Sequence, residues 1–110
     1  MSDSQAEVTP QDAARRTSDT LLIDVRDNVE WAAGHAPDAT HISLGNLQAD
    51  SVPADARVMF ICRTGGRSGA ATTAFRRVGI NASNVAGGMA AWSAAGLPVV
   101  RDDNAAGVVL

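Results

Sequence analysis

The chain has 110 residues, an apolar fraction of 45% and a net charge of −3 at neutral pH. This length suits one small domain over residues 1–110, and we expect its core at about 9–100 and a loose polar tail over 101–110. The apolar content excludes an intrinsically disordered chain, the acidic balance argues against nucleic-acid binding, and no apolar run is long enough to span a membrane.

The first half of the chain alternates helix signals with strand signals. Thr9 followed by Pro10 is typical of a helix start, because the hydroxyl can accept an N–H bond and proline suits the first helical position. The continuous apolar run over 20–25 is typical of a strand buried on both faces. In chain order, the expected elements are a helix from Thr9 to about Arg16, a strand over 20–25, a helix that starts at Asp27 or Asn28 and ends at Gly34, a strand over 40–43 and a helical turn over 44–49.

The second half continues the alternation. The expected elements are a strand over 57–61, a helix over 68–78, a strand over 83–86 and a helix over 88–95. Within the helix over 68–78, we expect Ala74, Phe75 and Val78 to share a buried face. Strands that alternate with helices predict an α/β fold, in which a parallel sheet is covered by helices on both faces.

The only cysteine, Cys62, directly follows the apolar strand predicted over 57–61. The residues after it are Arg63, Thr64, Gly65, Gly66, Arg67 and Ser68. A strand, a tight loop and a helix start would place the sulfur over backbone N–H groups, which bind anions and stabilise a thiolate. A lone cysteine is more often a small buried apolar residue, but such a cysteine needs neither paired glycines nor paired arginines. We therefore predict that Cys62 is a nucleophile.

Two further polar residues are expected near the cysteine. In helix-covered parallel sheets, ligands bind at the carboxyl ends of the strands. Cys62 stands at that end of its predicted strand, and Asp24 and Arg26 stand at that end of theirs. We expect a network between Asp24 and Arg26, or between Asp24 and the backbone, that supports the cysteine loop without touching the substrate.

Segments on both sides of the cysteine loop carry a family resemblance. They are Leu22-Ile23-Asp24-Val25-Arg26, Glu30-Trp31, Gly34-His35-Ala36-Pro37-Asp38-Ala39, His41-Ile42, Val85-Ala86-Gly87-Gly88-Met89-Ala90-Ala91-Trp92 and Ala95-Gly96-Leu97-Pro98-Val99. In this order and spacing, the chain resembles the single-domain rhodaneses, which are sulfurtransferases of the thiosulfate type. The resemblance covers nearly the whole chain, from about Thr9 to Val100.

The resemblance implies a three-layer rhodanese-like fold with a parallel sheet of about five strands. It also implies a sulfurtransferase that moves a sulfane sulfur from a donor such as thiosulfate or polysulfide through a persulfide on Cys62. The donor is expected to contact the loop, with Arg63 or Arg67 binding its oxygens. The alternative for Arg67, at a helix start, is that it faces solvent or pairs with an acidic residue. The turn that contains His35 implies a structural role for this residue, and we expect neither His35 nor His41 to form a Cys–His pair.

The single cysteine also bears on partners and location. It cannot form an intramolecular disulfide, so no oxidising compartment is implied and a cytoplasmic location is expected. A persulfide on it has no resolving thiol in the same chain. The acceptor is therefore expected to be external: cyanide, a low-molecular thiol or a protein thiol. No metal, organic cofactor, nucleic acid or membrane partner is implied.

Two other functions stay open on the same fold. Phosphatases and arsenate reductases share the strand, cysteine loop and helix, and their loop normally has five residues between the cysteine and the arginine. Here four residues separate Cys62 from Arg67, so we expect a smaller cradle that suits sulfur better than a phosphoryl group. The second alternative is a non-catalytic rhodanese-like interaction module, a class that commonly lacks the cysteine.

Overall fold

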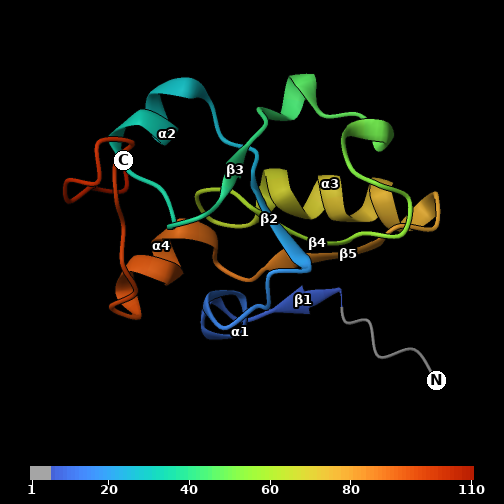
Figure 1. Ribbon diagram of the computed structural model, residues 1–110, viewed down its shortest axis with the longest axis horizontal. Coiled ribbons are helices and arrows are strands. Elements are labelled where there is room, and N and C mark those ends of the chain that lie inside the picture. Colours follow the sequence, from blue (N-terminus) through green and yellow to red (C-terminus); the bar gives the residue numbers. More distant parts are fainter. Residues whose placement is uncertain (1–5) are drawn as a thin grey trace.

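A parallel sheet of five strands runs through the structure, a computed structural model that describes residues 6–110 (Figure 1). The strands are β1 (Glu7–Val8), β2 (Thr20–Asp24), β3 (Thr40–His41), β4 (Arg57–Ile61) and β5 (Asn81–Val85). Their order across the sheet is β1-β5-β4-β2-β3, and every neighbouring pair is parallel. The strand that leads into the cysteine loop, β4, therefore lies at the centre of the sheet.

Helices cover both faces of this sheet, so the predicted three-layer α/β architecture is confirmed. They are α1 (Pro10–Ala14), α2 (Asn28–Ala33), α3 (Gly66–Arg77) and α4 (Gly88–Ala94), with two 3₁₀ turns, η1 (Leu44–Asn46) and η2 (Ala49–Ser51). α3 packs on one face against β4 and β5, while α1 and α4 contact each other on the opposite face (Figure 1). No helix within residues 6–110 is long and apolar enough to cross a membrane. The short edge strand β1 is the one element of the sheet that the sequence pattern did not predict.

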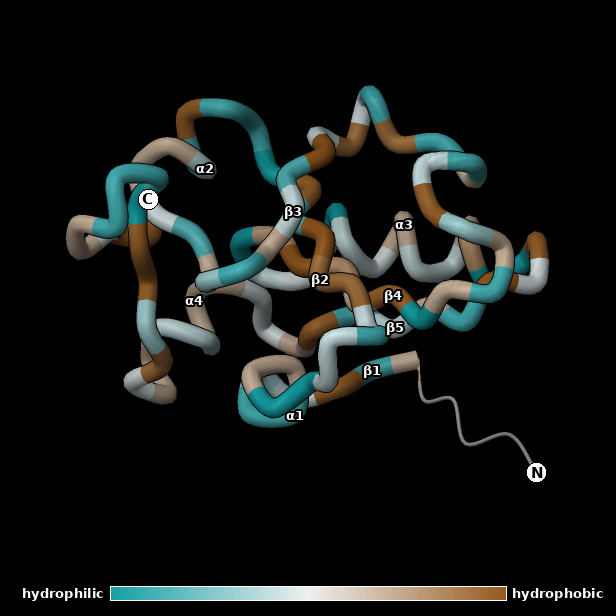
Figure 2. Tube along the Cα trace, in the orientation of Figure 1, coloured by the Kyte–Doolittle hydropathy of each residue, from teal (hydrophilic) through white to brown (hydrophobic). Residues whose placement is uncertain are grey.

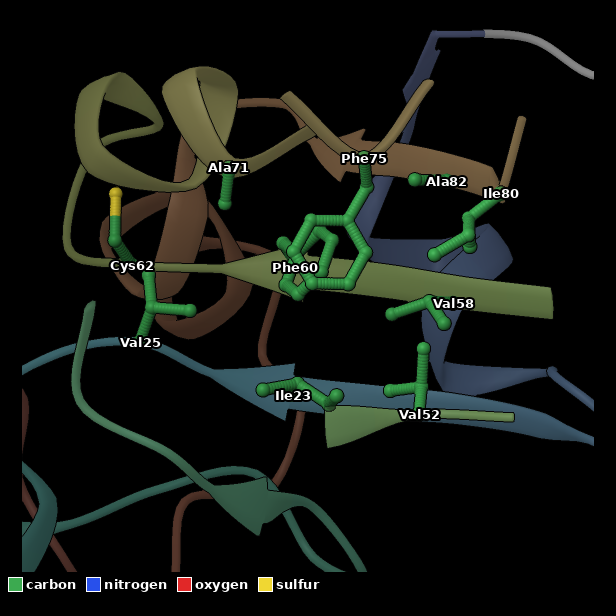
Figure 3. Packing of buried hydrophobic residues seen from close by; sticks show 10 residues of the cluster. All are labelled: Ile23, Val25, Val52, Val58, Phe60, Cys62, Ala71, Phe75, Ile80 and Ala82. Carbon is green, nitrogen blue, oxygen red and sulfur yellow. The ribbon is translucent and has the colours of Figure 1, made fainter. Parts of the chain in front are cut away.

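The core beneath α3 explains where the cysteine points. Side chains alternate between the two faces of a strand, so Val58, Phe60 and Cys62 all point toward α3. They pack there against Ala71 and Phe75, and the two phenylalanine rings meet edge to face at 4.8 Å between centroids (Figure 3). The same alternation that buries Val58 and Phe60 therefore carries the sulfur to the beginning of α3.

The opposite face of the sheet has a second core. Leu22 of β2 and Ile61 of β4 pack there against Met89 and Trp92 of α4, and all four are buried. The Trp92 indole N–H donates to the Pro98 carbonyl at 2.8 Å, which ties α4 to the segment that follows it. Figure 2 shows the hydrophobic residues gathered on the central strands. This burial on both faces is why β2 and β4 contain apolar residues at consecutive positions.

The buried face of α3 differs from the expected one. Its buried residues are Ser68, Ala71, Thr72 and Phe75, whereas Ala74 is exposed and Val78 is 63% exposed. Residues three, four and seven positions before Phe75 share its face, and Val78 already lies beyond the last helical turn. The expectation that Ala74 and Val78 face the core was therefore wrong.

The C-terminal tail is also different from the expectation of a loose segment. The Val108 N–H donates to the Ala33 carbonyl at 2.9 Å, and the Gly107 N–H donates to the Val99 carbonyl at 2.9 Å. Val109 packs against the core beneath α4. Backbone hydrogen bonds do not depend on side-chain polarity, which is why a polar composition did not reveal this packing.

Candidate active site

Cys62 lies at the carboxyl end of β4 and is 1% exposed. Its Sγ accepts the Gly65 N–H at 3.1 Å and the Ser68 hydroxyl at 3.2 Å. Figure 3 shows the sulfur directed toward the first turn of α3. The positive end of a helix dipole and two hydrogen-bond donors thus converge on one sulfur atom.

The backbone of Gly65 creates this geometry. Gly65 is the N-cap of α3 and has φ of +106°, a left-handed conformation that a residue with a Cβ rarely adopts. This conformation turns its N–H toward the sulfur three residues earlier. Gly66 is the first residue of α3 and is exposed. Thr64 is exposed, and its backbone N–H rather than its hydroxyl acts on the sulfur.

The loop lowers the pKa of Cys62. Burial of the sulfur by itself raises this pKa, but hydrogen bonds from the Ser68 hydroxyl and from the N–H groups of Ser68, Gly65 and Thr64 outweigh the burial. The net direction is a pKa below the ordinary value of a cysteine. A thiolate rather than a thiol is the nucleophilic form of cysteine, so the loop favours the reactive state.

Alkylation of Cys62 should report this pKa directly. We expect the pH profile of iodoacetamide labelling to have its inflection below the pKa of about 8.5 of a free cysteine. Ser68→Ala removes a hydrogen bond to the sulfur and should move the inflection upward, whereas Ser93→Ala, on the exposed side of α4, should not. An inflection at or above the free value would contradict this account of the loop.

α4 holds the beginning of the loop from the other side. The Met89 N–H donates to the Cys62 carbonyl at 2.7 Å, and the Ala90 N–H donates to the Arg63 carbonyl at 2.9 Å. A Cβ at Gly88 would lie 2.4 Å from the Cys62 carbonyl oxygen, so only glycine permits this approach. Gly87 and Gly88, the N-cap and first residue of α4, therefore allow the N-termini of α3 and α4 to meet at the cysteine.

The two loop arginines are each held by other parts of the chain. Arg67 donates to both carboxylate oxygens of Glu30 on α2, at 2.7 and 3.0 Å. These hydrogen bonds lower the pKa of Glu30 to about 2 and raise the pKa of Arg67. Arg63 is exposed, and its Nε donates to the Leu110 carbonyl oxygen at 2.6 Å. Glu30 and Leu110 were not expected at this site.

Asp24 and Arg26 form a buried ion pair at the end of β2. Arg26 Nη2 lies 2.8 Å from Asp24 Oδ2, and both side chains are almost completely buried. Arg26 Nη2 also donates to the Gly34 carbonyl at 2.7 Å, and the Arg26 carbonyl accepts from His41 Nε2 at 2.7 Å. These hydrogen bonds hold the segments around α2 and β3. A supporting role of the pair for the cysteine loop stays a prediction.

Both histidines have partners other than the cysteine. His35 stacks on Trp31 at 3.5 Å between ring centroids, and its Nε2 lies 2.9 Å from Asp102 Oδ1 in the tail. The Trp31 ring is also stacked on His41 at 4.9 Å. These contacts fit the structural role expected for His35. Within residues 6–110, no group of three or more His, Cys, Asp or Glu side chains is arranged to hold a metal ion.

Asn84 of β5 is a site residue that the sequence analysis missed. Its Oδ1 accepts the Ser68 hydroxyl at 2.5 Å, and its Nδ2 donates to the Gly65 carbonyl at 3.1 Å. Nδ2 also donates to the Glu7 carboxylate on β1 at 3.1 Å. Ser68 has one hydroxyl hydrogen, so Asn84 Oδ1 and Cys62 Sγ compete for it. No local pattern marks Asn84, because its partners are distant in the sequence.

Asn84→Ala is expected to reduce the free energy of unfolding by about 1–3 kcal/mol, because it leaves the buried Ser68 hydroxyl and the Gly65 carbonyl without this partner. Urea unfolding measures the change. The exposed Asn46→Ala serves as the matched control and should alter stability by about 0.5 kcal/mol or less. Equal effects of the two substitutions would contradict the bridging role of Asn84.

Comparison with known proteins identifies relatives over most of the chain. The sequence model of the rhodanese-like domain family matches residues 9–95 of this chain. A sulfurtransferase of Allochromatium vinosum is 34% identical over 90 residues, which are 79% of this chain and 84% of that protein. The relatives therefore include a named sulfurtransferase of similar size.

Solved structures agree with this relationship. A rhodanese-related protein from Thermoplasma volcanium has a TM-score of 0.80 at 26% identity, covering 87% of this chain and 98% of that one. A Rhodopseudomonas palustris protein of unknown function, described as a possible tyrosine phosphatase, has a TM-score of 0.71 at 30% identity, covering 83% of this chain and 81% of that one. The family match begins at the N-cap of α1, ends at the C-cap of α4 and contains the whole cysteine loop. The chain therefore belongs to the rhodanese-like domain family.

Proposed function

We propose that the protein is a sulfurtransferase that carries a sulfane sulfur as a persulfide on Cys62. The observation that supports this most is the position of the sulfur at the N-terminus of α3, where the Gly65 N–H and the Ser68 hydroxyl stabilise a thiolate. In the first step, the thiolate attacks the outer sulfur of the donor. The S–S bond of the donor breaks, and the leaving group departs with the bonding electron pair.

The second step discharges the persulfide to an external acceptor. Cys62 is the only cysteine, so no second thiol of the same chain can take the sulfur. A thiolate or cyanide attacks the outer sulfur, the Cys62 S–S bond breaks, and the electron pair returns to Cys62 Sγ. The acceptor is cyanide in an assay, and a low-molecular thiol or a protein thiol in the cell.

A phosphatase is the second candidate, and the similarity to the Rhodopseudomonas palustris protein is the observation that favours it. Two features of the site argue against it. The loop has four residues between Cys62 and Arg67, which limits the room for a phosphoryl group. Arg67 is bonded to both oxygens of Glu30, so a phosphate would have to compete with a carboxylate for the same guanidinium.

Parallel assays with sulfur donors and an aryl phosphate separate the candidates. We expect intact mass spectrometry to show one added sulfur atom after incubation with thiosulfate or a polysulfide, and dithiothreitol to remove it. Hydrolysis of the aryl phosphate should stay at the uncatalysed rate. Faster phosphate hydrolysis than sulfur transfer would establish the phosphatase instead, and the absence of both activities would favour a non-catalytic interaction module.

A further inference from the structure

The contact between Glu30 and Arg67 joins α2 to the first turn of α3. Both carboxylate oxygens of Glu30 accept from Arg67, at 2.7 and 3.0 Å. Glu30 is itself fixed, since it also accepts the Asp27 N–H at 3.2 Å in the capping box that begins α2. Its side chain is 13% exposed, while that of Arg67 is 39% exposed. The pair is therefore a well-held bidentate ion pair beside the cysteine loop.

This contact changes the charge that an incoming donor meets. The hydrogen bonds to Glu30 are the main cause of the raised pKa of Arg67, and the charges of Glu30, Cys62 and Asp27 act in the same direction. Glu30 carries one negative charge and accepts two hydrogen bonds from Arg67, so it offsets the positive charge of this guanidinium at the loop. Without Glu30, the loop would have one more uncompensated positive charge.

Two chemical classes of sulfur donor, thiosulfate and hydropersulfides, differ in how much they need positive charge at the loop. Thiosulfate is a dianion, and attack by the Cys62 thiolate on its outer sulfur releases sulfite with the bonding electron pair, leaving the persulfide on Cys62. A hydropersulfide, R–S–SH, carries at most one negative charge. The same attack on its outer sulfur gives the Cys62 hydropersulfide and R–S⁻, and the atoms and charges of this step balance. The Cys62 thiolate repels this donor less than it repels the thiosulfate dianion.

We propose that Glu30 determines donor specificity by neutralising Arg67, so that the site takes sulfur from hydropersulfides in preference to thiosulfate. This inference rests on the proposed sulfurtransferase function. It reassigns Arg67, which the sequence suggested as a ligand for donor oxygens, to a contact within the protein. Arg63, the other arginine of the loop, donates to the backbone oxygen of Leu110.

The test is Glu30→Gln, which keeps one oxygen for the capping box, removes the negative charge and replaces the second oxygen that accepts from Arg67 with an amide N–H donor. We expect kcat/KM for thiosulfate to rise by about fivefold to tenfold, because Arg67 becomes available to the dianion. The kcat/KM for the hydropersulfide of 2-mercaptoethanol should change by less than about twofold, because this donor gains little from an added positive charge. Persulfide formation is followed by mass spectrometry and rates by sulfite or thiol release.

Two controls isolate the pair. In an Arg67→Gln background, Glu30→Gln should give no further gain with thiosulfate, since the guanidinium that it would release is absent. Asp12→Asn removes the same charge from an exposed pair with Arg15 on α1 and should leave donor preference unchanged. Thermal unfolding verifies that each variant is folded.

The outcomes distinguish this inference from the proposed function. If the unmodified protein gains no sulfur from any donor, the sulfurtransferase function itself fails. If it gains sulfur but uses thiosulfate more efficiently than the hydropersulfide, the inference alone is overturned. The same holds if Glu30→Gln leaves the ratio of the two kcat/KM values unchanged, or if the gain persists without Arg67.

Discussion

Cys62→Ser is expected to abolish both persulfide formation and turnover with every sulfur donor. A serine hydroxyl at this position would still receive the Gly65 N–H and could pack in the same space, but it is not ionised near neutral pH and cannot carry a sulfane sulfur. The fold should be kept, because the two side chains have nearly the same volume. Intact mass spectrometry after incubation with thiosulfate or a hydropersulfide measures the first effect, and a cyanide assay measures the second.

The matched control restores a thiol outside the loop. Cys62→Ser combined with Ser93→Cys places the only cysteine on the exposed side of α4, without the donors that bond Cys62 Sγ. This double variant should turn over no faster than the uncatalysed reaction. Full activity of Cys62→Ser would eliminate the persulfide mechanism. Turnover by the double variant at the rate of the unmodified protein would show that any exposed thiol suffices and that the loop contributes nothing.

Asp24→Asn is expected to reduce the free energy of unfolding by about 3–5 kcal/mol, a large share of the stability of a small domain. The carboxylate accepts from the backbone N–H and from the guanidinium of Arg26, whose side chain is 0% exposed. Loss of the carboxylate charge leaves this buried cation without compensation. Arg26 Nη1 already lacks a hydrogen-bond partner among the described residues, so there is little to replace the lost contact. Urea unfolding gives the change directly.

Asp12→Asn provides the comparison for a solvent-exposed ion pair. Asp12 and Arg15 approach to 3.2 Å on α1, but their side chains are 51% and 73% exposed. Solvent screens such a pair, and we expect a loss of about 1 kcal/mol or less. If Asp24→Asn lowers the free energy of unfolding no more than Asp12→Asn does, burial of the Asp24–Arg26 pair does not make its loss more destabilising. Replacement of both buried partners by apolar residues should recover part of the loss, because no buried charge then remains.

Local signals in the sequence located most elements of the fold. The Thr9 hydroxyl accepts the Asp12 N–H at 3.0 Å, as expected from a residue that begins a helix before proline. Asp27 caps α2 and receives the Glu30 N–H at 2.9 Å. The bounds of β4, residues 57–61, are those predicted from its apolar run. Such signals act between residues a few positions apart, so they can be recognised without tertiary structure.

The start of α3 shows where local signals were incomplete. We expected this helix to begin near Ser68, a residue type that often caps helices, but it begins at Gly66. Its N-cap is Gly65, which makes no side-chain cap bond and is selected by its left-handed φ. Ser68 is thereby moved into the helix, where its buried hydroxyl can reach Cys62 Sγ. The residue was correctly expected near the sulfur, whereas its place in the helix was not.

The sequence by itself determined the α/β class, the central strand and the cysteine loop at its end, because each depends on side-chain alternation or on conformations of adjacent residues. Only the tertiary structure decided the partners of that loop. Glu30 reaches Arg67, Asn84 reaches Ser68, and the Leu110 carbonyl reaches Arg63 across 37, 16 and 47 positions of sequence. Contacts of this kind depend on which elements the sheet brings together at its carboxyl edge. No periodicity or spacing along the chain encodes them, and they set both the charge around Cys62 and the donor that we expect it to accept.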